Sequence, residues 1–294
     1  MSIITAVSCA VAILGSGTRG CRTLKGYVNR RFLLEKGYKF DKNLDTLDDE
    51  TVSELIQRGV LIPLPQDLGS EAVNVDPVYE TITGMDIPVS RPIYGWRIRF
   101  AGDKCLGAAL ASYSNKAWDL LEVDENGHLN AVETADGFIK GFSTNLVQYE
   151  GMTGNDGSVG SKHTLRIQLT KQGSIEYDTK WATIASDEVD WSALQGVDEI
   201  LLEKTTDGKL KATFACDNST PVNGLTTSNL RALDSTGAVV AGFAIVAAGD
   251  GLYTVSGLTG PGDFIIHTYD STLQTRTIVL GNYFYKSNDL KWTA

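Results

Sequence analysis

The sequence predicts a mainly β protein: a β-sandwich or barrel body with one short helix and extended arms, followed by a second, smaller β-sandwich. Three observations support this prediction. The chain has 294 residues, enough for two domains, and its 30 glycines and recurrent Thr, Val, Ile and Tyr favour strands and turns. Apolar and polar residues alternate along several segments. Prolines concentrate in one stretch, where they disfavour both helices and central strands.

The alternating segments predict strands that bury one face. Residues 96–100 alternate apolar side chains with arginines. Residues 163–183 show the same period on both sides of Gln172-Gly173, so they predict one long β-hairpin. Further strands are expected over 118–123 and near 138–148.

One helix is predicted, over residues 48–58. Thr46 is expected to cap it, and Asp49 stands at the third helical position, where a carboxylate suits the helix N-terminus. Apolar residues fall on one face, and Gly59 provides a stop signal.

Residues 60–92 contain five of the seven prolines. Each proline fixes its own φ and removes a backbone donor, so this stretch is expected to be a long loop or an extended arm. Long segments of this kind usually have a function. Reaching a neighbouring subunit is one such function.

The chain is predicted to divide into residues 1–216, the body with its arms, and residues 217–294. A hairpin with a turn at 206–208 precedes the boundary. Beyond it, short strands recur between Gly-rich turns, which indicates a small sandwich.

The net charge of −10 argues against nucleic-acid binding, because phosphate contacts need Lys and Arg. The charge is uneven: residues 16–40 hold seven basic groups against one acid, a local charge of +6 that leaves −16 elsewhere. This segment is either a basic arm that docks on an acidic face of another subunit or an ordinary solvated surface.

The four cysteines are widely spaced and form no CxxC pair, so free thiols in a reducing compartment are expected. The apolar run from Ile3 to Leu14 lacks a preceding positive charge and is too short to span a bilayer. It is expected to be a buried strand or an arm that packs on a partner.

Catalytic and ligand-binding motifs are missing. The three histidines, at positions 128, 163 and 267, are isolated, and no nucleophile elbow, HExxH or dinucleotide fingerprint occurs. In the Gly-rich loop 150–162, the order Gly160-Ser161-Lys162 does not fit a phosphate-binding loop. The acids at 187, 188 and 190 fit a solvated loop better than a cation site. The sequence therefore predicts no enzyme, no metal and no cofactor.

Aromatic side chains leave one alternative open. Trp96, Trp118, Tyr177 and Trp181 offer rings that can stack on sugars, although rings on alternating strands are more often core residues. A carbohydrate-binding or adhesion module is therefore kept as an alternative.

Four features together resemble tail-tube and related virion proteins of tailed bacteriophages. They are the predicted hairpin, the short helix, the Gly-rich loop and the extended arm. The C-terminal segment resembles the Ig-like modules that such proteins carry. The residues that carry this second resemblance are Pro221-Val222-x-Gly224-Leu225, Asp250-Gly251-x-Tyr253-x-Val255 and Gly262-Asp263-Phe264.

The resemblance implies a tail tube (major tail) subunit. Copies would form a homo-oligomeric ring, expected to be a hexamer, by joining sheets edge to edge. The rings would stack through a long loop and arms, and would contact other virion proteins. DNA would pass through them without sequence preference, and no membrane would be a partner. The implied subunit contacts are Gly151, Gly154, Asp156, Gly157 and Gly160 in the loop, Arg30 and Arg31 in the basic segment, and Pro63 and Pro65 in the Pro-rich arm.

The basic segment departs from this pattern, because positive charge in the lumen would hold DNA back. It is therefore placed between subunits. The expected location is the virion tail after synthesis in the host cytoplasm, and the alternative within the particle is a capsid-associated or head–tail ring protein.

Overall fold

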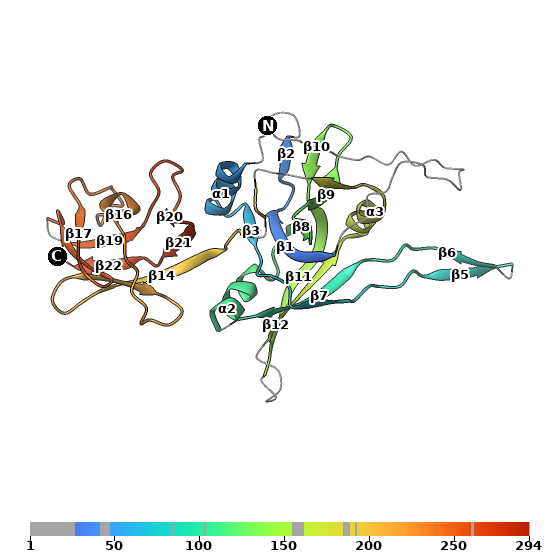
Figure 1. The fold of residues 1–294 in the computed structure, drawn as a ribbon, viewed down its shortest axis with the longest axis horizontal. Coiled ribbons are helices and arrows are strands. Elements are labelled where there is room, and N and C mark those ends of the chain that lie inside the picture. The colour runs from blue at the N-terminus through green and yellow to red at the C-terminus, as the bar shows by residue number, and fades with distance from the viewer. Residues whose placement is uncertain are drawn as a thin grey trace. The chain divides into compact units, whose positions relative to one another are not determined.

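The computed structural model describes residues 27–41, 48–83, 85–102, 104–154, 162–184, 189–191, 193–259 and 262–293. It is mainly β, with curled sheets and a few short helices, which confirms the predicted fold class (Figure 1). The chain divides into two compact units, one of residues 1–52 and 60–194 and the other of residues 53–59 and 195–294.

This division lies earlier in the chain than the predicted boundary after residue 216. Strands β14 (Val197–Lys204) and β15 (Leu210–Phe214) form the hairpin that the sequence analysis placed in the first domain. In the structure β15 pairs with β18 (Leu252–Ser256), so the hairpin belongs to a sheet of the second unit. The predicted hairpin turn is confirmed, but the hairpin belongs to the second unit, which, apart from residues 53–59, begins at residue 195 after the first unit ends at 194.

The first unit is built on a curled sheet in the order β2-β10-β9-β8-β11-β12-β7-β4. Strand β1 pairs with both β8 and β3, and β13 pairs with β9. The bounds are β1 Val28–Glu35, β2 Lys39–Asp41, β3 Leu61–Pro63, β4 Gly69–Ala72, β7 Gly95–Ala101, β8 Trp118–Asp124, β9 Leu129–Glu133, β10 Phe138–Lys140, β11 Phe142–Thr153, β12 Lys162–Leu169 and β13 Trp181–Ile184.

One apolar core of this unit packs against a single face of β7 and β12. Along β12, His163, Leu165, Ile167 and Leu169 are buried while the residues between them are partly exposed. This pattern is the two-residue alternation read from the sequence. Trp96, Trp118, Tyr177 and Trp181 also lie in this core or pack against it, so they are core residues and not a sugar-stacking surface.

Helix α1 (Asp49–Gln57) confirms the helix predicted over 48–58. Its cap is Asp48, whose Oδ1 accepts a hydrogen bond from the Thr51 N–H at 2.8 Å. The predicted cap, Thr46, lies outside the described residues. Helix α2 (Lys104–Tyr113) was not predicted, because its small residues give only a weak amphipathic pattern.

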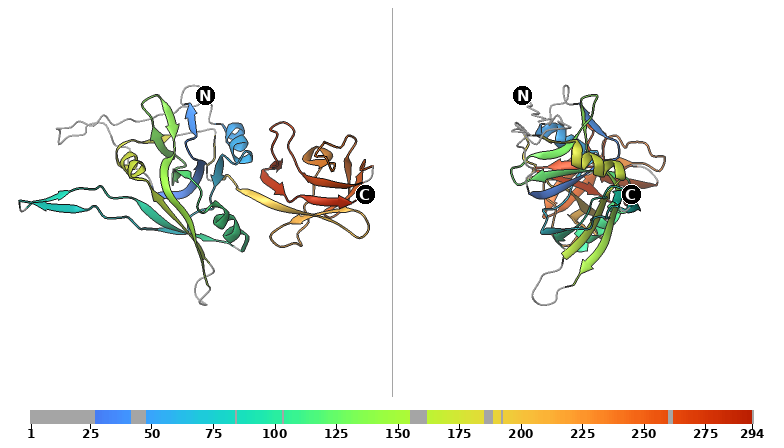
Figure 2. Two further views of the ribbon diagram at one scale, coloured as in Figure 1. Left: turned by 180° about the vertical axis from the view of Figure 1, so that it is seen from behind. Right: turned by 90° about the vertical axis from the view of Figure 1, so that its right-hand side faces the viewer.

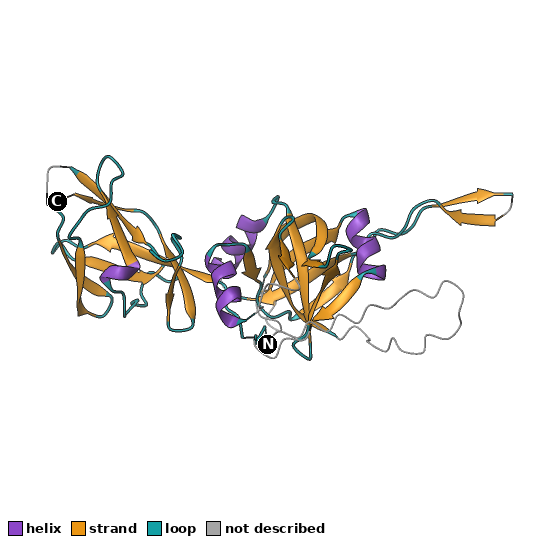
Figure 3. Ribbon diagram, turned by 90° about the horizontal axis from the view of Figure 1, so that it is seen from above, coloured by secondary structure: helices purple, strands orange, loops and turns teal. Residues whose placement is uncertain are grey.

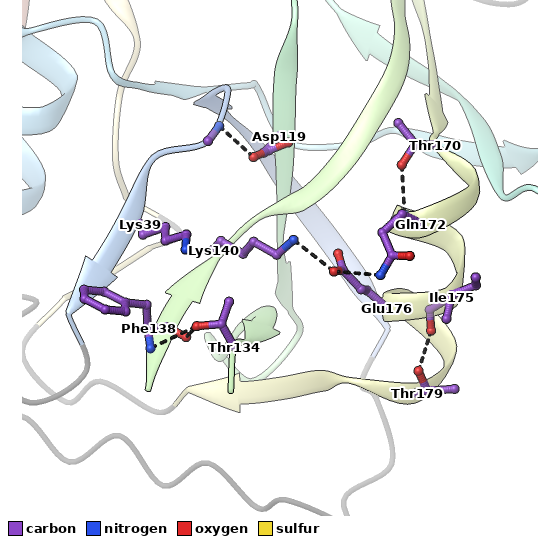
Figure 4. Close-up of polar contacts among 12 residues, drawn as sticks. Lys39, Asp119, Thr134, Phe138, Lys140, Thr170, Gln172, Ile175, Glu176 and Thr179 are labelled. Atoms are coloured by element: carbon purple, nitrogen blue, oxygen red, sulfur yellow. Dashed lines mark hydrogen bonds and ion pairs between the residues drawn. The ribbon is translucent and has the colours of Figure 1, made fainter. Parts of the chain in front are cut away.

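The predicted hairpin 163–183 is wrong in its second half, which forms helix α3 (Lys171–Thr179). Thr170 caps the helix by accepting a hydrogen bond from the Gly173 N–H at 2.8 Å. Figure 4 shows how the helix is held: Glu176 accepts hydrogen bonds from Lys140 of β10 at 2.9 Å and from Gln172 at 3.2 Å. The local cap at Thr170 and the bond from the distant Lys140 override the strand-like alternation of the sequence.

Cys105 and Cys216 are both disulfide-bonded, so the prediction of free thiols is wrong for these two residues. Cys9 and Cys21 lie outside the described residues. The argument for a reducing compartment from free thiols therefore no longer holds.

The second unit is a β-sandwich (Figure 3). One sheet has the order β17-β18-β15-β14-β21-β20, the other β16-β19-β22, and residues of both form one apolar core. The remaining bounds are β16 Leu230–Leu233, β17 Ala244–Gly249, β19 Asp263–Thr268, β20 Ile278–Leu280, β21 Tyr283–Ser287 and β22 Leu290–Thr293, with a 3-10 turn at Thr227–Asn229.

Tyr253 organises the core of this sandwich. Its hydroxyl donates to the Val222 carbonyl at 2.8 Å and accepts from the Leu225 N–H at 3.2 Å. Three residues that carry the Ig-like resemblance therefore meet at one buried point. Tyr253 and Phe264 are buried, so neither ring belongs to an exposed aromatic row.

Candidate assembly interface

A two-stranded arm projects from the body of the first unit (Figures 1 and 2). We define the arm as residues 69–95, which start with β4 and include β5 (Tyr79–Ile82) and β6 (Met85–Pro88). Backbone bonds continue along it, with Val75 and Ile93 exchanging hydrogen bonds of 2.8 and 3.0 Å. The Pro-rich segment is thus extended β-structure that leaves the body and returns to it.

The outer part of the arm has two different faces. Residues directly opposite each other on paired strands share a face, and successive residues alternate. The pairs Ile82–Met85 and Glu80–Ile87 share one face, and the Val89 N–H bonds to the Val78 carbonyl at 2.8 Å in the same register. We call this face the apolar face; its large apolar residues are Val78, Ile82, Met85, Ile87 and Val89.

The other face of the hairpin is more polar. It carries Tyr79 opposite Pro88 and Thr81 opposite Asp86. The Thr81 hydroxyl donates to the Asp86 carboxylate at 2.6 Å. The arm therefore has the amphipathic alternation of a strand pair that covers a hydrophobic surface.

The apolar face covers nothing among the described residues. Its five apolar side chains are between 43% and 64% exposed. An isolated two-stranded hairpin is marginally stable in water, and a cluster of exposed apolar side chains marks an interaction site. The arm therefore has the chemistry of a surface that is buried in an assembly.

The edges of the arm are less suited to binding than its face. Pro77, Pro88 and Pro92 have no backbone N–H, and prolines on edge strands limit sheet extension. Four carboxylates against one arginine give the arm a charge of −3. The hairpin thus combines an exposed apolar face with a net negative charge.

A buried ionic cluster lies where the chain enters the arm. Arg31 of β1 forms an ion pair through Nη1 with Asp67, two residues before β4. Its Nε lies 3.4 Å from Oε1 of Glu122, which is directly opposite on β8. All three side chains are buried, and the Trp96 ring lies 5.6 Å from the Arg31 guanidinium.

Arg31 forms the ion pairs with both carboxylates of this cluster, and Arg30 adds a smaller favourable interaction with Asp67. Burial raises the pKa of Asp67 to about 7, with Arg31 opposing the increase and Glu122 adding to it. Oδ1 of Asp67 is buried without a hydrogen-bond partner among the described residues. Burial and nearby Glu122 also raise the pKa of Tyr177.

The contact residues predicted from the sequence lie in different places. Arg30 and Arg31 are buried within the first unit, where Arg30 Nε donates to the Leu64 carbonyl at 2.9 Å. Their charges are thus used inside the unit, which does not match the expected contact between subunits. Pro63 is buried in β3 and Pro65 is half-buried, both on the body side of the arm.

The Gly-rich loop is described only in part. Gly151 lies at a register shift of the β11–β12 pair with a φ of +106°, and Gly154 follows the end of β11. Asp156, Gly157 and Gly160 lie outside the described residues. The proline content of 60–92 predicts an extended arm, but its apolar face follows from the register of β5 and β6, which proline content does not specify.

Within the described residues, no group of three His, Cys, Asp or Glu side chains has the arrangement of a metal site. None of the helices in the described ranges is long and apolar enough to cross a bilayer. His163 is buried, and its Nδ1 lies 2.8 Å from the Tyr149 hydroxyl.

No protein-family model matches the chain, and no curated protein matches it either.

Proposed function

We propose that the protein is a structural subunit that assembles with copies of itself, and that it forms the stacked rings of a bacteriophage tail tube through which DNA passes. The observation that carries this proposal is the apolar face of the projecting arm. Side chains that alternate as in a buried strand pair but remain exposed fit a subunit whose final surface forms on assembly.

A second copy is the partner that we propose for the arm. Such a contact is heterologous, with two different surfaces meeting, and repeats into a ring or a stack. The outward side chains of β7 and β12 include Arg97, Arg99 and Arg166, which are partly exposed. These arginines form ion pairs within the subunit, with Glu150 and with Glu71 of the arm, so the proposed contact rests on the apolar face and not on charge complementarity.

The overall charge supports the passage of DNA. A chain with a net charge of −10 does not retain a polyanion, so an acidic ring is suited to a lumen through which DNA slides. The second unit, a separate sandwich, takes the outer, decorating position in this proposal, and the mature protein is located in the virion tail.

Electron microscopy of the purified full chain tests the proposal. Stacked rings or tubes are the expected result. Single closed rings that never stack would favour the head–tail ring alternative. A monodisperse monomer at every concentration would reject both.

A further inference from the structure

The second unit has a small cavity of about 330 Å³ at one end of its larger sheet. Three segments line it: the end of β15, residues 221–224, and the hairpin of β20 and β21. All eight lining residues are uncharged, although 21% of the chain is charged. The cavity is at the lower end of the size range of small-molecule sites, enough for one ring-sized group.

Two of the eight residues that line the cavity, Phe214 and Tyr285, are aromatic. The rings of Phe214 and Tyr285 have centroids 5.7 Å apart, and that of Tyr283 lies 6.4 Å from Tyr285. Tyr283 does not line the cavity and is 52% exposed, whereas Tyr285 is 8% exposed, so the row of rings continues from the cavity to the surface. Aromatic faces carry partial negative charge and attract the C–H bonds of a flat, weakly polar face.

The rim supplies hydrogen-bonding groups without charge. Asn223 is exposed, and its Oδ1 accepts from the Gly251 N–H at 2.8 Å, which fixes the side chain. Its amide NH2 makes no hydrogen bond to other described residues and has two donors for a ligand. Gly224 and Gly281 have φ of +86° and +64°, a backbone conformation that favours glycine, and the space beside each is open.

We propose that this cavity binds a single neutral sugar ring, as the terminal residue of a glycan. A pyranose has a C–H face that stacks on aromatic rings and hydroxyls that accept from an amide, and it carries no charge. A proline-rich peptide would need an extended aromatic groove for several residues, whereas this cavity has room for one ring. The site is independent of the arm.

Saturation-transfer NMR on the full chain, with methyl glycosides of glucose, galactose, mannose and N-acetylglucosamine, tests the proposal. At least one glycoside is expected to bind with a Kd of about 1 mM, a typical strength for one small ring with few polar contacts. Two variants are matched: Leu280→Asp places a charge in the cavity, and Val279→Asp places it on the neighbouring residue of β20, which does not line the cavity.

Leu280→Asp is expected to weaken binding at least ~10-fold, because a carboxylate would lose its hydration in an apolar wall, and Val279→Asp should leave binding unchanged. If Leu280→Asp does not fold, Asn223→Asp is the second test variant. It keeps the side-chain oxygen that accepts from the Gly251 N–H and removes the two N–H donors of the amide. It should weaken binding ~5-fold or more, the effect of one lost hydrogen bond. No binding by any glycoside, equal binding by all variants, or binding of a proline-rich peptide instead would overturn the proposal.

Discussion

Arg31 and Asp67 form an ion pair whose side chains are only 2% and 3% exposed, at the point where the chain enters the arm. Arg31 also faces Glu122, so one cation serves two buried carboxylates. The free energy of unfolding is thus expected to depend on whether Asp67 is protonated.

Stability should fall as the pH rises through neutrality. The pKa of Asp67 increases from 3.8 in the unfolded chain to about 7 in the folded protein, so the folded state binds this proton more tightly. The resulting stabilisation is complete below pH 3.8 and is lost as the pH rises to about 7. The free energy of unfolding should decrease by ~2–3 kcal/mol between pH 5 and pH 7 from this group alone.

Urea unfolding across this pH range measures the effect. Asp67→Asn has no proton to lose, so its stability curve should be flatter than that of the wild type. Arg30, Arg31, Glu122 and Tyr177 are the other charged or titratable groups of the cluster and remain in place. Identical slopes for the two proteins would contradict the account.

Removing Arg31 should destabilise the first unit strongly. In Arg31→Leu, Asp67 and Glu122 lose their shared cation while buried, and breaking a buried pair in this way costs about 3–5 kcal/mol. The matched control is Lys39→Ala, which removes a cation from the exposed Asp136 pair and should change stability by less than ~0.5 kcal/mol. The denaturant midpoints of the two variants measure this difference. Similar losses of stability in both would show that the buried cluster contributes no more than an exposed ion pair.

Gly173→Ala should be more destabilising than Thr170→Ala. A Cβ at Gly173 would collide with the Ser143 carbonyl on β11, so α3 would have to move away from the sheet. Loss of the Thr170 cap removes one hydrogen bond and is expected to cost ~1 kcal/mol. Thermal unfolding followed by circular dichroism measures the loss of stability in each variant. A larger loss for Thr170→Ala than for Gly173→Ala would show that α3 packs more loosely on β11 than described.

Much of the fold could be predicted from the sequence, because burial imposes its period on the strands. Residues 96–100 and 163–169 are strands with the expected inward side chains. The stretch 171–179 was misread, because its alternation arises from a helix fixed by a local cap and by a lysine distant in sequence. Pairings such as β15 with β18 carry no local signal, so the unit boundary was misplaced.

The candidate site was predictable only in outline. Proline content indicated an extended arm, but the face on which Ile82 and Ile87 meet depends on the register of the hairpin. The basic residues Arg30 and Arg31 looked exposed in the sequence and are buried, because their partners Leu64, Asp67 and Glu122 lie far along the chain. No spacing signal indicated that Cys105 and Cys216 are disulfide-bonded.

The central claim is that the apolar face of the arm drives self-assembly, and sedimentation velocity of two matched arm variants tests it most directly. One variant combines Ile82→Lys and Ile87→Lys on the apolar face; the other combines Tyr79→Lys and Thr81→Lys on the opposite face. Both add the same charge to the same exposed hairpin. The account predicts that the wild type and the second variant form large assemblies while the first remains a folded monomer. Equal assembly of both variants, or a monomeric wild type, would contradict it.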